Sequence, residues 1–292
     1  MKQYTMIFAR TAAVMMLLGL AAFIQVKAQT ATPAYVETNG LIVDDKVYEH
    51  ILTSTRAMIE ARKVTAASKL VGQLDRTQCS VSRPKPAKKV LAAADLYEQH
   101  KASVLVVATL YKCHVCPNDH LTAATGFVIG ADGLAVTSYH VFNGNATRDR
   151  LDLTHVVMDS QGNVYPITEV LAAHKGDDVA IFKIGGGEKL SPVPLADAAR
   201  VGENVCIIAH PHSMFYSFSS GTLSRMYMRE GGEKMTVTAD FGQGSSGGPV
   251  FNDKGNVVGV VSATLSLYHA DGHLQMVSKE TIPVQRIRAL IR

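Results

Sequence analysis

The run Gly244–Pro249, with the sequence Gly-Ser-Ser-Gly-Gly-Pro, has the clearest chemical signature in the chain. Glycine permits positive φ angles and lets main-chain N–H groups come close to a substrate. Such N–H groups can stabilise the oxyanion of an acyl-transfer intermediate. A serine hydroxyl is a weak nucleophile until a base takes its proton and an acid orients that base. The run therefore predicts Ser246 as a nucleophile that needs a histidine and a carboxylate from elsewhere in the chain.

Two upstream segments contain candidates for the base and the acid, Val136–Val141 and Asp177–Ile184. Together with the glycine-rich run they resemble the trypsin-like serine peptidases, most closely the bacterial HtrA/Deg branch. His140 stands in a T-x-x-H-V motif, Asp178 begins a D-[LIV]-A-[LIV] strand, and Ser246 is the serine of G-x-S-G-G-P. The order of histidine, aspartate and serine is that of the chymotrypsin class. The resemblance extends from about residue 91 to the end of the sequence.

This resemblance implies a serine endopeptidase that cleaves proteins or peptides without a cofactor. His140 would take the proton from Ser246, Asp178 would orient His140, and the N–H groups of Gly244 and Ser246 would form the oxyanion hole. Asp177 competes for the role of the acid, but it precedes the strand by one position. The alternative function is that of a catalytically silent, trypsin-like module that binds peptides.

The glycine-rich run also satisfies G-x-S-x-G, the nucleophile motif of α/β-hydrolases. That fold requires a helix directly after the serine, whereas Pro249 and the strand-like Val250-Phe251 follow Ser246. It also requires an acid and then a histidine downstream, and only 46 residues remain. The sequence therefore excludes this second class of hydrolase.

The resemblance also suggests residues that bind substrate. Asp240 lies six positions before Ser246, the spacing at which trypsin places the acid at the floor of its specificity pocket. Ser262, Ala263 and Thr264 fall where trypsin-like enzymes form the pocket wall. Thr264 would narrow an entrance that trypsin keeps open with glycine. A preference for basic residues is thus one hypothesis, and a solvated or hydrogen-bonded Asp240 is the favoured one.

Short β-like runs separated by turn residues fill the sequence after residue 102, which indicates a sandwich or barrel and no parallel α/β sheet. The resemblance makes the fold class all-β, with two six-stranded antiparallel β-barrels. A helix is predicted at Ile282–Ile291. Relatives of the HtrA type usually add a PDZ domain, but the barrel and this helix account for the residues after the serine, so we expect none.

The sequence divides into three parts. Residues 1–28 read as a signal peptide cleaved after Ala28, because a positive start precedes an apolar run that is shorter than a membrane span. Residues 29–89 are expected to be a helical and linker segment, which could serve as a pro-segment. Apolar residues recur there at helical intervals over 47–74, and the proline-rich, charged stretch 82–89 is typical of a linker. Residues 90–292 form the predicted peptidase domain.

The predicted signal peptide places the mature protein in the periplasm or outside the cell. It holds three of the 29 basic side chains and none of the 25 acidic ones, so the mature chain is close to neutral. A nearly neutral protein gives no indication of nucleic-acid binding. The sequence also predicts no membrane span after cleavage, and it does not determine the oligomeric state.

Four cysteines lie in the exported part, and an even number in an oxidising compartment predicts two disulfides. Three pairings of Cys79, Cys113, Cys116 and Cys206 are open. Cys113 and Cys116, with His120, also match a short zinc-ligand spacing. Disulfides and no metal are the favoured prediction, with zinc as the alternative.

Overall fold

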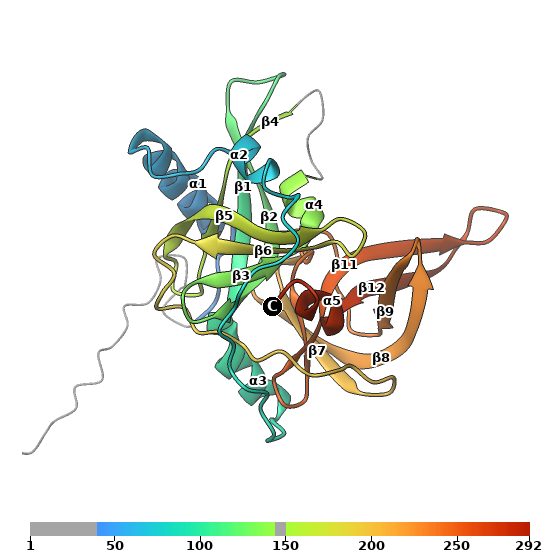
Figure 1. Cartoon of the computed structure of the whole chain (residues 1–292). Coiled ribbons are helices and arrows are strands. Elements are labelled where there is room, and N and C mark those ends of the chain that lie inside the picture. The colour runs from blue at the N-terminus through green and yellow to red at the C-terminus, as the bar shows by residue number, and fades with distance from the viewer. Residues whose placement is uncertain (1–39, 144–149) are drawn as a thin grey trace, which may run out of the picture. The chain divides into compact units, whose positions relative to one another are not determined.

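A computed structural model describes residues 40–143 and 150–292. The predicted signal peptide and its cleavage after Ala28 lie outside the described residues. Within these residues the strands close into two antiparallel barrels of six strands each, as Figure 1 shows. This confirms the predicted all-β class.

The first barrel has the strand order β1-β2-β3-β6-β5-β4. Both faces of its first strand are apolar and buried. Alternate residues of a strand point to opposite faces, so Val104 and Val106 join one buried cluster while Leu105 and Val107 join another. The strands of this barrel are β1 (Val104–Cys113), β2 (Asp119–Gly130), β3 (Leu134–Thr137), β4 (Arg150–Met158), β5 (Val164–His174) and β6 (Val179–Ile184).

The second barrel has the strand order β10-β11-β12-β9-β8-β7. Two of its neighbouring strands, β11 and β12, extend beyond the barrel as a projecting hairpin (Figure 1). The strands are β7 (Asn204–Ala209), β8 (Ser217–Arg229), β9 (Gly232–Val237), β10 (Pro249–Asn252), β11 (Val257–Tyr268) and β12 (Leu274–Pro283).

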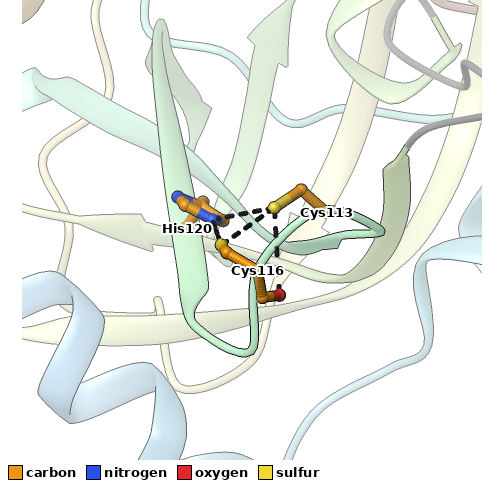
Figure 2. A group of neighbouring side chains, drawn as sticks. All are labelled: Cys113, Cys116 and His120. Carbon is orange, nitrogen blue, oxygen red and sulfur yellow. Dashed lines mark hydrogen bonds between the residues drawn. The ribbon is translucent and has the colours of Figure 1, made fainter.

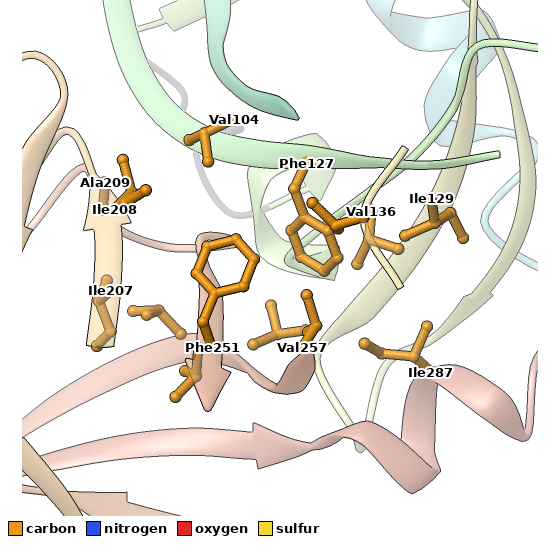
Figure 3. Close-up of a cluster of buried hydrophobic side chains, with 14 of the residues drawn as sticks. Val104, Phe127, Ile129, Val136, Ile207, Ile208, Ala209, Phe251, Val257 and Ile287 are labelled. Carbon is orange, nitrogen blue, oxygen red and sulfur yellow. The ribbon is translucent and has the colours of Figure 1, made fainter. Parts of the chain in front are cut away.

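One hydrophobic cluster joins the two barrels (Figure 3). Phe127 and Val136 contribute to it from the first barrel, and Phe251 and Val257 contribute from the second. All four side chains are fully buried. Because removal of apolar surface from water is the main favourable term in folding, this shared core stabilises both barrels and the seam between them.

The described part of the predicted N-terminal segment packs against the barrels. Helix α1 (Asp44–Glu60) buries Val47 and Ile51 completely in the cluster that the barrels share, and α2 (Ala67–Val71) buries Leu70 in the second cluster. The expected linker is exposed along most of its length. It is nevertheless fixed to the second barrel by the Asn256 side chain, which bonds both the N–H and the carbonyl oxygen of Ala87 at 2.7 and 2.8 Å.

One short helix is shorter than expected, and another was not expected at all. The predicted C-terminal helix is present as α5 (Val284–Arg288), but it is shorter than Ile282–Ile291 because the start of that range completes β12. The sequence analysis did not predict α3 (Ala93–His100), which precedes a short 3₁₀ turn, η1 (Lys101–Ser103). The other short elements are α4 (Tyr139–Asn143) and a second 3₁₀ turn, η2 (Pro211–Ser213). Across the described ranges, every helix is too short or too polar to traverse a bilayer.

The burial of α1 gives the first testable prediction. Ile51→Ala should lower the free energy of unfolding by about 2–5 kcal/mol, because it leaves a cavity in the shared core. Thr53→Ala, at an exposed position of the same helix, is the control and should change it by less than about 0.5 kcal/mol. Urea denaturation followed by circular dichroism measures both. Equal, small effects would show that α1 does not belong to the folded core.

Candidate active site

His140 and Asp178 are held together by the first barrel. His140 lies in α4, directly after β3, and Asp178 directly precedes β6, the strand that pairs with β3. The Nδ1 atom of His140 is 2.9 Å from each carboxylate oxygen of Asp178, and the main-chain N–H of His140 donates to Asp178 Oδ1 at 3.0 Å. The carboxylate therefore fixes both the main chain and the ring of His140, with Nδ1 as donor and Nε2 free to act as a base.

A third donor reaches the same carboxylate from the second barrel. The Ser262 hydroxyl donates to Asp178 Oδ2 at 2.6 Å. Burial alone would raise the pKa of Asp178, but the hydrogen bonds from His140 and Ser262 outweigh burial and hold that pKa below its ordinary value. Asp178 is therefore ionised at neutral pH. The sequence analysis expected Ser262 in the wall of the specificity pocket, whereas its side chain contacts the acid.

Asp177, the competing acid, has a different partner. Its buried carboxylate accepts a hydrogen bond from Arg286 of α5 at 2.6 Å and lies 2.8 Å from His174 Nδ1. The φ angle of Asp178 is +52°, a left-handed conformation that aspartate tolerates better than most residues. The chain turns at this point, and the two neighbouring carboxylates contact different parts of the protein. The geometry favours Asp178 over Asp177 as the partner of His140.

The loop that carries Ser246 belongs to the second barrel and is bound by the first. The N–H of Thr125 in β2 donates to the carbonyl oxygen of Ser246 at 2.9 Å, and its hydroxyl donates to that of Gly244 at 2.8 Å. Gly247 has a φ angle of +83°, and a Cβ atom there would lie 2.2 Å from the hydroxyl oxygen of Thr137. Only glycine fits this close approach of the two barrels.

The expected oxyanion hole uses the main-chain N–H of Gly244, so the direction of that N–H matters. Gly244 has a φ angle of +94°, and a Cβ atom there would lie 2.4 Å from the carbonyl oxygen of His210. The preceding carbonyl, that of Gln243, accepts a hydrogen bond from the His212 N–H at 2.6 Å. In a trans peptide the N–H points opposite to the carbonyl, so the Gly244 N–H is directed away from His212.

His140 and Ser246 line the same cavity of about 120 Å³, with Gly244 and with Thr122 and Ala123 of β2. The hydroxyl of Ser246 makes a long hydrogen bond of 3.4 Å to the main-chain oxygen of Ser262. The structure thus brings His140, Asp178 and Ser246 to one place from three distant parts of the sequence.

The remaining substrate-binding candidates fall in two neighbouring cavities. Asp240 and Thr264 line a cavity of about 720 Å³, and Ala263 lines one of about 650 Å³ with His140. The side chain of Asp240 is 84% exposed and pairs with Lys279 Nζ at 2.6 Å. This lysine, which the sequence analysis did not single out, lowers the pKa of Asp240 and offsets its charge.

Comparison with known proteins agrees with this geometry. Residues 124–260 match the family described as trypsin-like peptidase domain. This match covers just under half of the chain. Among solved structures, an HtrA-type protease, AlgW with a decapeptide, superposes with a TM-score of 0.55 and 18% identity, over 68% of this chain and 66% of that one. At this identity the likeness shows a shared fold and nothing about activity.

Curated proteins similar to this chain include the magnetosome formation protease MamE of Magnetospirillum gryphiswaldense, 30% identical over 147 residues, which are 48% of this chain and 18% of MamE. A probable periplasmic serine endoprotease, DegP-like, of Rickettsia prowazekii is 29% identical over 156 residues, or 49% of this chain and 28% of that protein. The chain thus spans well under half the length of these relatives. Both are named as proteases, and the name of the second agrees with the HtrA/Deg branch that the motifs resemble.

The different partners of the two aspartates lead to a second prediction. Asp178→Asn should lower kcat/KM for peptide cleavage on the order of 10⁴-fold, because the amide no longer holds the required tautomer of His140. Asp177→Asn should leave kcat/KM within about tenfold and instead lower the free energy of unfolding by about 1–3 kcal/mol through its weakened bond to Arg286. Steady-state kinetics on variants whose folding is verified by circular dichroism separate the two. A larger kinetic loss at Asp177 would overturn the assignment of the acid.

Proposed function

We propose that the protein is a serine endopeptidase that hydrolyses proteins or peptides through an acyl-enzyme. The observation that carries this proposal is the hydrogen bond between His140 Nδ1 and the half-buried, ionised Asp178, at the edge of a cavity that His140 and Ser246 both line. A catalytically silent peptide-binding module has less support, because a binding module has no need of an oriented histidine beside a serine.

The residues divide the chemical steps as follows. Rotation about the Cα–Cβ bond of Ser246 releases its weak hydrogen bond to the main-chain oxygen of Ser262 and turns the hydroxyl toward Nε2 of His140. Hydrogen bonds between a catalytic serine and its base are often long until substrate binds. His140 takes the proton as Ser246 Oγ attacks the substrate carbonyl, and Asp178 stabilises the charged imidazole. The N–H groups of Gly244 and Ser246 stabilise the oxyanion. His140 then protonates the leaving amine, and water hydrolyses the acyl-enzyme by the same steps in reverse.

We further propose that the described part of residues 29–89 is a permanent part of the fold, in place of the expected pro-segment. Val47 and Ile51 lie in the shared core. Two cavities are lined by His140 and a third by Asp240, and the residues that line all three come from the chain after residue 100. Helix α1 therefore stabilises the first barrel and does not block the site.

The site of action that we propose is the periplasm or the extracellular space. The predicted signal peptide supports it, as does the name of the periplasmic DegP-like relative. An N-terminus at Gln29 in the mature protein is the direct test, and a mature chain that retains residues 1–28 would contradict it.

The pairing of Asp240 with Lys279 argues against a strong preference for basic residues. Lys279→Met should raise kcat/KM for peptides with arginine before the scissile bond, relative to peptides with leucine there, by about tenfold, because it leaves an unpaired carboxylate to attract a cation. Lys88→Met, at an exposed position of the linker, is the control and should leave the ratio unchanged. Fluorogenic peptide pairs measure the ratio. An unchanged ratio in Lys279→Met would show that Asp240 does not contact the substrate.

The decisive variant for the proposed function is Ser246→Ala. It should reduce casein and peptide hydrolysis on the order of 10⁶-fold, because the nucleophile of the triad is removed. Ser245→Ala, one position away and buried, should retain activity within about tenfold if the fold is kept. Retention of more than a few per cent of the activity in Ser246→Ala would refute the proposal.

A further inference from the structure

Three side chains of types that can bind metal ions converge at the loop between β1 and β2 (Figure 2). The sulfur atoms of Cys113 and Cys116 are 3.0 Å apart, and His120 Nε2 lies 3.2 Å from the first and 2.9 Å from the second. These residues have no part in the proposed peptide hydrolysis.

The hairpin holds these donors in place. Cys113 is the last residue of β1, and His120 is the second residue of β2, paired in register with Tyr111. The ring of His120 stacks on that of Tyr111 with centroids 5.2 Å apart, and the guanidinium of Arg150 lies 3.7 Å from the centroid of the Tyr111 ring. The imidazole is therefore aimed at the two sulfurs by neighbours on β1 and β4.

The geometry fits a shared ligand better than a disulfide. The structure shows all four cysteines without a disulfide, so the two predicted disulfides are not formed in it. A Cys113–Cys116 bond would join the two sulfurs at about 2.05 Å and would give His120 no role. A tetrahedral zinc ion with bonds of about 2.3 Å to sulfur and about 2.0 Å to nitrogen places the donors roughly 3.5–3.8 Å apart. Small side-chain rotations open the observed triangle to that size.

We propose that Cys113 Sγ, Cys116 Sγ and His120 Nε2 bind one Zn²⁺ ion, with water in the fourth position. Two thiolates and an imidazole are among the donors that zinc prefers, and binding releases the two thiol protons to solvent. This assignment replaces the prediction that these cysteines form a disulfide and that the protein holds no metal.

The proposed site connects the hairpin to the cleft. Two residues after His120, β2 supplies Thr122 and Ala123 to the cavity that Ser246 lines. On the other side, the neighbouring Asp119 forms a 2.8 Å ion pair with Arg56 of α1. A metal ion at this point would fix the loop where the N-terminal helix meets the strand that borders the cleft.

The test uses the full-length mature protein with Ser246→Ala, which prevents self-digestion. Metal analysis by mass spectrometry should find about one zinc per chain, and His120→Ala and Cys113→Ser should reduce this to about one tenth or less. His269→Ala, an exposed histidine of the β11–β12 hairpin, is the matched control and should retain the metal. Replacement of zinc by Co²⁺ should give thiolate-to-metal charge-transfer and tetrahedral d–d absorption bands, which vanish in Cys113→Ser.

Thiol alkylation before any reduction provides a second measurement on the same preparation. Chelation of the metal should expose Cys113 and Cys116 to alkylation, whereas the metal-loaded protein should react slowly at both. A Cys113–Cys116 disulfide in the isolated protein would overturn the proposal, as would the absence of Co²⁺ bands in the reduced protein with one equivalent of Co²⁺. Neither of these results would affect the assignment of His140, Asp178 and Ser246.

Discussion

The candidate site depends on the hydrogen bonds from Thr125 to the loop that carries Ser246. Thr125 belongs to the first barrel, and its N–H and hydroxyl bind the carbonyl oxygens of Ser246 and Gly244 in the second. The proposed nucleophile and the proposed base lie in different barrels, so their separation is set by this seam. Gly247 allows it, because any side chain there would collide with Thr137 and push the barrels apart.

A second constraint is electrostatic. A buried carboxylate is unfavourable unless it is paired or hydrogen-bonded. Asp178 meets this condition with donors from both barrels, His140 from the first and Ser262 from the second. The hydrogen bond through which Asp178 orients the imidazole thus also helps to keep the acid ionised. The carboxylate of Asp177 is paired with a different residue, Arg286, and this ion pair connects the turn before β6 to the C-terminal helix.

The sequence alone predicted the elements whose chemistry or periodicity is local. The strand expected at the Asp178 motif is observed as β6 (Val179–Ile184), since a mostly apolar run follows the two aspartates. Much of β8 and of β12 is exposed or half-buried, so neither strand shows a comparable run of buried residues. Those strands are stabilised by pairing with β9 and β11, a non-local effect that no window of sequence displays.

The same distinction applies to the site. Motifs identified His140, Asp178 and Ser246, and the structure brings these three together. Spacing placed Ser262 in a pocket wall, but which of its groups contacts the acid depends on how the barrels dock. The partnership of Lys279 with Asp240 and the convergence of His120 with Cys113 and Cys116 also depend on pairing between strands. Side-chain partners across a barrel cannot be derived from spacing in one chain.

The central claim is that the docked barrels activate Ser246 through His140, and chemical reactivity tests it most directly. A fluorophosphonate probe reacts with a serine hydroxyl only when a base has activated it. Incubation of the mature protein with this probe, followed by peptide mapping, should place the label on Ser246 in nearly every chain, and His140→Ala should abolish it. An unlabelled protein that is correctly folded, or a label on Ser245 or another serine, would contradict the account.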